Sequence, residues 1–226
     1  MKVFFACLAL FSAAFADGEM SFAMGSKITR LPEEFFVTER LFSPLSTFDI
    51  STDLEPLAVV SKRFFSFTPS FDLEDVNNGP LASASAHFFT WGTIADVKDP
   101  KGQKIGCIEE EIWRIFPWAE YRVLNALGEV VSVAKMDLLG TEFSLFHPDF
   151  PDHIYATISR PIIHWLRDSW TVRIFNKEAF EQTGMDPRLL MMLAVYQTDK
   201  DNRDRWRILI ESQISTEIYQ YEGTRF

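Results

Sequence analysis

The densest group of metal-type side chains in the sequence lies between residues 147 and 153. His147 and His153 flank Asp149 and Asp152, so two imidazoles and two carboxylates fall within a short stretch. Such side chains bind zinc and iron, but their spacing here matches no established ligand pattern. The two prolines of the same stretch favour an extended connection between strands. We therefore expect a solvated loop that holds neither a metal ion nor another cofactor.

A second group, Glu109–Glu111, could supply the two carboxylates that glycoside hydrolysis places on opposite sides of a sugar bond. Adjacent residues of a strand point to opposite faces, so only Glu109 and Glu111 would share one. A charged outer surface explains these residues without catalysis. The sequence also contains no nucleophile elbow, glycine-rich dinucleotide loop, phosphate-binding loop or His-Glu-x-x-His zinc motif. We predict that the protein is not an enzyme and has no catalytic residues.

The other histidines and the later cysteine fit structural roles. His87 and His164 each lie in an aromatic segment, where packing or hydrogen bonding accounts for an imidazole. Cys107 lies in an apolar run typical of a strand. We therefore expect a small buried side chain at this position and not a reactive thiol.

The charge of the chain limits its partners. Its formal net charge is −10 at pH 7. So acidic a chain lacks the broad basic surface that nucleic acids require, and no nucleic acid is expected as a partner. The most basic stretches are Lys62–Arg63 and Arg203–Arg207, and the second is diluted by Asp199, Asp201 and Asp204. We predict that both stretches are solvated surface.

Residues 1–16 have the pattern of a secretory signal peptide. A basic start at Met1–Lys2 precedes an apolar run, Val3–Phe15, and Ala14–Ala16 supplies the small residues that signal peptidase recognises before Asp17. The apolar run is shorter than the roughly 20 residues of a membrane-spanning helix. We therefore predict cleavage after residue 16 and export, either to the periplasm or out of the cell. The exported chain would hold Cys107 as its only cysteine and could form no internal disulfide.

After an N-terminal arm, residues 17–34, the sequence changes to short runs rich in β-branched and aromatic residues. Turn motifs such as Asn77–Gly79, Asp99–Gly102 and Leu139–Gly140 separate the runs and suit tight hairpins. Alternation within the runs gives each strand one face for a core, and the short turns predict antiparallel pairing. The runs typical of strands are Phe36–Leu41, Leu57–Ser61, Phe64–Leu73, Leu81–Phe89, Gly92–Val97, Lys104–Glu111, Tyr121–Asn125, Val130–Met136, Glu142–Phe146, Ile154–Ser159 and Trp170–Phe175.

A faint repeat runs through these strands: an aromatic segment, a strand, a glycine turn and a second strand. Its copies begin at Arg63–Phe67, His87–Trp91 and Arg114–Trp118, with a degraded fourth at Ile163–Trp165. One hairpin of this kind cannot bury its apolar face alone, so several must close around a common core. We expect the Phe-Phe and Trp positions of the repeat to line that barrel and not to form a ligand cage.

One segment breaks the strand pattern. Asp186 is a good helix N-cap and Pro187 suits the first turn, while every residue from Leu189 to Tyr196 is apolar or aromatic. A helix without a polar face must be enclosed on all sides, and this one is too short to cross a bilayer. We therefore predict a helix near residues 187–198 inside the curved sheet that precedes it.

The aromatic hairpins, the run Asp168–Phe175 and the Asp-capped apolar helix together resemble the LURP-one-related family over about Leu57–Gln197. The relatives of that family include tubby C-terminal domains and phospholipid scramblases. The resemblance implies a mainly β fold, a closed antiparallel barrel of about twelve strands around a hydrophobic C-terminal helix. The barrel domain would span residues 35–205. In the tail, residues 206–226, the apolar spacing fits a strand and a helix equally.

The resemblance further implies an exported, non-catalytic module that binds a phospholipid or a membrane-associated protein. Tubby-type domains bind phosphoinositides through basic residues, whereas no equivalent cluster is found in this acidic chain. Two alternatives stay open: an exported protein-interaction factor without a lipid ligand, and a metal-dependent hydrolase built on His147 and His153. The sequence by itself specifies no ligand-binding residues.

Overall fold

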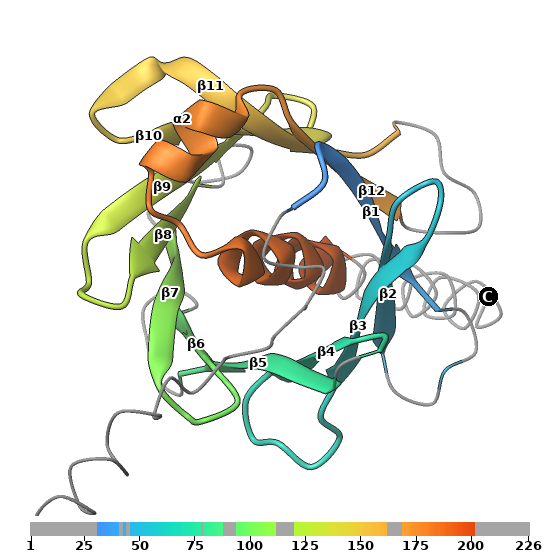
Figure 1. Ribbon diagram of the computed structural model, residues 1–226. Coiled ribbons are helices and arrows are strands. Elements are labelled where there is room, and N and C mark those ends of the chain that lie inside the picture. Colours follow the sequence, from blue (N-terminus) through green and yellow to red (C-terminus); the bar gives the residue numbers. More distant parts are fainter. Residues whose placement is uncertain are drawn as a thin grey trace, which may run out of the picture.

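The computed structural model describes residues 31–40, 43, 46–77, 79–87, 94–111, 120–161 and 169–201. Within these ranges the strands form one closed barrel in which each strand pairs antiparallel with its neighbours in the sequence, and β1 pairs with β12 (Figure 1). The closed antiparallel barrel that the family resemblance implies is confirmed. The signal peptide of residues 1–16, most of the N-terminal arm and the tail of residues 206–226 lie outside the described residues.

The barrel wall consists of twelve strands in these ranges. They are β1 (Glu34–Glu39), β2 (Thr47–Ser51), β3 (Pro56–Lys62), β4 (Ser70–Asp75), β5 (Gly79–Ala86), β6 (Ile94–Lys98), β7 (Lys104–Glu111), β8 (Glu120–Asn125), β9 (Val130–Met136), β10 (Glu142–His147), β11 (Phe150–Ser159) and β12 (Ser169–Ile174). Successive side chains along a strand point alternately into the barrel and out to solvent, as predicted. In β12, for example, Trp170 and Val172 are fully buried while Arg173 is exposed and bonds Glu34 of β1.

The β2 strand lies in a segment to which the sequence pattern assigns no strand. Only Phe48 and Ile50 alternate there as apolar residues, and both are fully buried in the barrel. Pairing with β1 and β3 stabilises the strand, although its own sequence gives a weak signal.

The prediction of one strand over Phe64–Leu73 is wrong at its start. β4 begins at Ser70, and residues 63–69 form a turn that Arg63 closes by donating its backbone N–H to the Ser70 carbonyl at 2.9 Å. Pro69 at the end of the turn lacks the N–H that strand pairing would use. The aromatic residues at the start of the run therefore lie in a connection and not in the barrel wall.

A helix passes through the centre of the barrel (Figure 1). It is described over residues 187–201, and we term it the central helix. The carboxylate of Asp186 accepts the backbone N–H of Arg188 at 2.9 Å, as an N-cap does. No residue from Leu189 to Tyr196 is more than 5% exposed, which confirms the enclosed helix near residues 187–198. In the described part of the chain, no helix has the length and apolar character needed to span a membrane.

The central helix packs tightly against one strand of the wall. At Gly106 of β7, an added Cβ would lie 2.6 Å from Cδ1 of Leu189 and 2.4 Å from the carbonyl oxygen of Leu124. Only glycine therefore fits at this contact. A short helix that the sequence did not predict, α2 (Lys177–Gln182), precedes the central helix and packs on β11.

Candidate functional site

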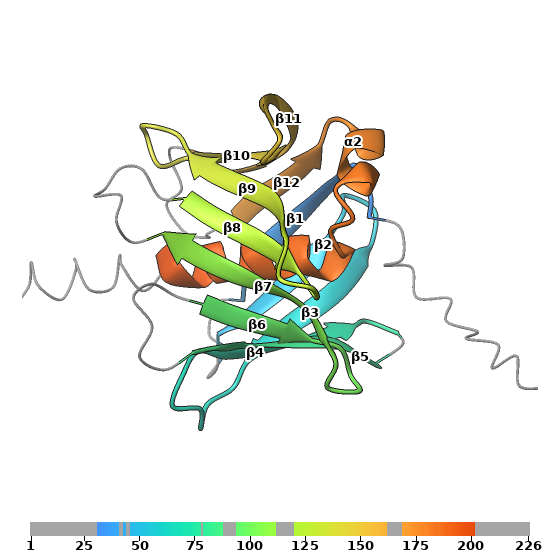
Figure 2. The ribbon, with the colours of Figure 1, turned by 90° about the vertical axis from the view of Figure 1, so that its left-hand side faces the viewer.

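The two ends of the barrel differ in chemistry. Strands β3, β7 and β9 run toward the end where residues 196–201 of the central helix lie, which is the left-hand end in Figure 2. We term it the exit end. The helix begins at the opposite end, where short hairpin turns such as 99–103 connect the strands.

Three ion pairs tie the last described turn of the central helix to the wall at the exit end. The wall residues come from β3, β7 and the segment after β11, so the helix is held from three sides. Each of the three cations also lies near an aromatic ring of the wall, at 5.1 to 5.8 Å from the ring centre. The pairs are Lys62 with Asp199, Lys200 with Glu110, and Arg160 with Asp201, and the corresponding rings are Phe71, Tyr121 and Trp170.

The pair of Lys62 and Asp199 corrects the prediction that Lys62–Arg63 is solvated surface. Lys62 Nζ lies 2.7 Å from Asp199 Oδ1, and the two side chains are only 25% and 3% exposed. Arg63 does face solvent, where it bonds Asp72, and this bond raises the pKa of its guanidinium. The other basic stretch, Arg203–Arg207, lies outside the described residues.

The turn between β3 and β4 exposes three phenylalanines at the exit end. Phe64, Phe65 and Phe67 are 68%, 94% and 98% exposed. The rings of the first two pack edge to face, with centres 4.8 Å apart, and Ser66 Oγ lies 2.9 Å from Ser70 Oγ across the turn. These contacts give the turn a defined shape that holds the rings in solvent.

The exposed rings correct the prediction that the Phe-Phe positions of the repeat line the barrel. The fully buried aromatic residues of the wall belong to strands instead, and they include Phe35, Phe48, Phe143 and Trp170. The aromatic segments of the other copies, residues 88–91, 114–118 and 163–165, lie outside the described residues. A signal was present in the sequence: Pro69 and two serines interrupt the strand pattern directly beside these phenylalanines.

The structure does not assemble a metal site from the group around His147 and His153. These residues belong to a hairpin and not to an extended loop, because β10 ends at His147 and β11 already begins at Phe150. His147 Nδ1 lies 3.7 Å from the carboxylate of Asp149. Among the described residues, no three His, Cys, Asp or Glu side chains are placed to hold a metal ion.

The acidic run of β7 is divided between the two faces of the wall, as strand alternation requires. Glu111 bonds Arg122 of β8, whereas Glu110 points inward and pairs with Lys200 of the central helix. The charged outer surface expected for Glu109 and Glu111 therefore does not extend to Glu110, whose side chain contacts the central helix. Its role in the structure is to hold the helix.

A polar cluster around Asp96 lies on the outer face of β6 and β7. The Asp96 carboxylate accepts a hydrogen bond from His87 Nε2 at 2.7 Å and lies 2.6 Å from Lys104 Nζ. Burial alone would raise the pKa of Asp96, but the bonds from Lys104 and His87 hold it below its usual value.

Cys107 is buried as predicted, and burial raises the pKa of its thiol to about 12. The other histidine, His164, lies outside the described residues.

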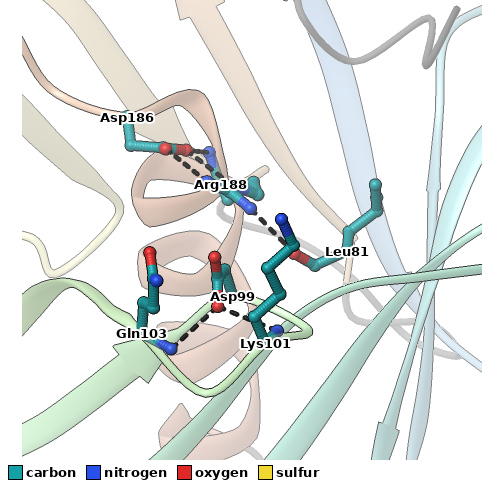
Figure 3. Close-up of polar contacts among 6 residues, drawn as sticks. All are labelled: Leu81, Asp99, Lys101, Gln103, Asp186 and Arg188. Carbon is teal, nitrogen blue, oxygen red and sulfur yellow. Dashed lines mark hydrogen bonds and ion pairs between the residues drawn. The ribbon is translucent and has the colours of Figure 1, made fainter. Parts of the chain in front are cut away.

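The opposite end of the barrel shows a second group of polar contacts (Figure 3). Arg188 of the central helix donates to both carboxylate oxygens of Asp186 and to the Leu81 carbonyl at 2.9 Å. Asp99 accepts the backbone N–H groups of Lys101 and Gln103, which shapes the turn between β6 and β7. These bonds fix the start of the helix and the nearby turn.

The family model described as LURP-one-related matches residues 33–197. That range extends from the residue before β1 into the central helix. No curated protein matches the chain.

Proposed function

The chain belongs to the LURP-one-related family, and from this premise we propose that it is an exported, non-catalytic binding module that attaches to a membrane by the exit end of its barrel. One observation carries the proposal: the turn between β3 and β4 presents Phe64, Phe65 and Phe67 to solvent. Contiguous exposed apolar side chains on a folded protein mark a surface that contacts a partner or a membrane.

Energetics favour insertion of these rings into the bilayer interface. Burying a phenylalanine side chain is worth about 1.5–3 kcal/mol, and partial insertion gains a share of that. The Arg63–Ser70 and Ser66–Ser70 contacts already define the turn, so less ordering is needed on binding. Interfacial binding strength increases with the apolar area that enters the headgroup boundary.

The charges at the exit end support attachment through apolar side chains and not through ionic contacts with lipid headgroups. In the described part of the chain, the two basic residues that directly precede the phenylalanines in the sequence are already engaged: Lys62 pairs with Asp199 and Arg63 with Asp72. The chain as a whole carries a formal charge of −10. Anionic headgroups therefore gain little from this surface. We expect binding to zwitterionic vesicles that changes little with salt concentration.

Vesicle co-sedimentation tests the proposal on the purified exported protein. The variant Phe65→Ser/Phe67→Ser should lower the partition coefficient on phosphatidylcholine vesicles at least about 10-fold, which corresponds to about 1.4 kcal/mol. Leu54→Ser is the matched control, because Leu54 is 95% exposed in the β2–β3 turn at the opposite end. It should bind as the unchanged protein does.

Two results would contradict the proposal. One is a failure to sediment with phosphatidylcholine, phosphatidylserine-containing and phosphoinositide-containing vesicles alike. The other is equal loss of binding in the control variant and the phenylalanine variant. Binding that needs phosphoinositide and disappears in high salt would replace the apolar attachment by a headgroup site.

Export rests on the pattern of residues 1–16 and is tested separately. The intact mass of the protein recovered from the periplasm or the medium should correspond to a chain that begins at Asp17. Retention of residues 1–16, with the protein inside the cell, would contradict this part of the proposal.

An exported protein-interaction factor is the second candidate, and the same exposed phenylalanines favour it. Its signature is a defined partner that crosslinks to the unchanged protein and to Leu54→Ser but not to Phe65→Ser/Phe67→Ser, together with no vesicle binding.

A further inference from the structure

A second apolar turn lies at the exit end, between β9 and β10. Leu138 and Leu139 at its tip are 66% and 72% exposed. The carboxylate of Asp137 accepts the backbone N–H groups of Thr141 and Glu142 at 2.7 and 3.0 Å. These hydrogen bonds define the shape of the turn, and the turn exposes both leucine side chains to solvent.

The side chain of Asp137 is well suited to keep this shape. Partial burial would raise its pKa, but the bonds from Glu142 and Thr141 hold the pKa below its usual value, so the carboxylate is ionised at neutral pH. Gly140 adopts a φ of +69°, which side chains other than glycine rarely adopt.

The two apolar turns lie on opposite sides of the same end. β3 and β9 both run toward the exit end, and the Arg160 that pairs with the central helix also donates its backbone N–H to the Thr141 carbonyl at 2.9 Å. Strands β5 to β8 separate the turns on one side of the barrel, and β11, β12, β1 and β2 separate them on the other. Figure 2 shows them at the left-hand end, one above and one below the central helix.

We infer that Leu138 and Leu139 form a second membrane contact, so that the barrel stands on the bilayer with its exit end down and its central helix steeply inclined to the membrane plane. This inference rests on the proposed function. One contact would leave the barrel free to tilt in every direction, whereas two contacts on opposite sides prevent it from tilting along the line that joins them. A bilayer is a flat apolar layer that reaches both turns at once.

A nitroxide label at single positions tests the orientation. Phe65→Cys, Leu139→Cys and Leu127→Cys are labelled at neutral pH in a chain whose Cys7 is serine or has been removed on export. Cys107 stays unlabelled there because it is buried and its pKa is about 12. Leu127 is the control, since it is 83% exposed in the β8–β9 turn at the opposite end.

With phosphatidylcholine vesicles, the labels at 65 and 139 should become more accessible to oxygen and less accessible to a water-soluble nickel chelate. The label at 127 should not change. Leu138→Ser/Leu139→Ser should lower the vesicle partition coefficient about 3- to 10-fold without changing the unfolding midpoint, because both side chains are exposed.

The outcomes separate this inference from the proposed function. A label at 139 that stays in water while the label at 65 enters the bilayer overturns the second contact and leaves membrane attachment intact. Entry of the label at 127 overturns the orientation. If both the 65 and 139 labels stay in water and no variant sediments with vesicles, the proposed function itself is wrong.

Discussion

At the level of single residues, the exit end shows how a chain of this acidity holds cations inside a barrel. Lys62 is three-quarters buried, yet its ammonium group meets the carboxylate of Asp199 and lies 5.8 Å from the ring centre of Phe71. A partly buried cation is tolerated when it has both an opposite charge and apolar contacts for its stem.

Lys62→Met should destabilise the protein by about 2–3 kcal/mol in urea unfolding. The change removes a cation 2.7 Å from a carboxylate that is almost fully buried, and taking an opposite charge away from a buried carboxylate is costly. Arg63→Met is the matched control. It removes the neighbouring, exposed pair with Asp72 and should cost less than about 1 kcal/mol. Equal costs for the two variants would contradict a structural role for Lys62.

Residue types alone did not show which side chains would meet. Lys62 and Asp199 are separated by 137 positions in the sequence, and Glu110 and Lys200 by 90. The sequence places Lys62 beside Arg63 in what looks like one basic patch. In the structure the two side chains differ. Lys62 points inward and pairs with Asp199 in the last described turn of the central helix, whereas Arg63 points outward and pairs with Asp72.

At the level of elements, the strands and the central helix were largely predictable, while their ends were not. Period-2 alternation and glycine turns are local signals, and they placed most of the strands. The sequence pattern predicts a strand from Phe64 onward because this segment is rich in phenylalanine, a residue common in strands, whereas the structure has a turn there. A turn that presents apolar side chains to a partner has the same composition as a strand that buries them.

Gly106→Ala should destabilise the fold by about 1–3 kcal/mol, because the added Cβ would overlap Leu189 of the helix and the Leu124 carbonyl. The test is a double-mutant cycle by urea unfolding. Leu189→Ala makes room on the helix side, so Gly106→Ala should cost less in its presence.

Gly102→Ala gives the matched cycle. Gly102 has a φ of +81° and no atom within 4 Å of an added Cβ, so its cost is backbone strain and should add to that of Leu189→Ala. Additive costs at Gly106 would show that the Leu124 carbonyl, and not the contact with Leu189, sets the cost of the added Cβ.

At the level of the whole molecule, the barrel and the helix stabilise each other. The helix has no polar face from Leu189 to Tyr196, and among the described residues the buried side chains of the strands and of the helix form one core cluster. Closure of the sheet by the pairing of β1 with β12 also removes the free edges that an open sheet would have.

Amide hydrogen exchange measures this mutual dependence. The N–H groups of residues 190–196 should be among the slowest to exchange in the protein, because they become exposed only when the barrel opens. The N–H groups of residues 64–67 should exchange rapidly, since that turn is outside the wall. Fast exchange in the central helix of the native protein would contradict the closed barrel.

The sequence by itself determined the antiparallel hairpins that must close around a core and the helix that they enclose, while the closed barrel of about twelve strands is what the family resemblance implied. The hairpins and the helix follow from local patterns: alternation assigns one face of each strand to a core, and a helix that is apolar all round can be stable in water only inside one. The tertiary structure alone decided which apolar residues stay outside and which charges go inside. Whether a side chain at a strand end is buried depends on where strand pairing ends and on which side chains of the central helix lie at that level. Both depend on residues far away in the sequence.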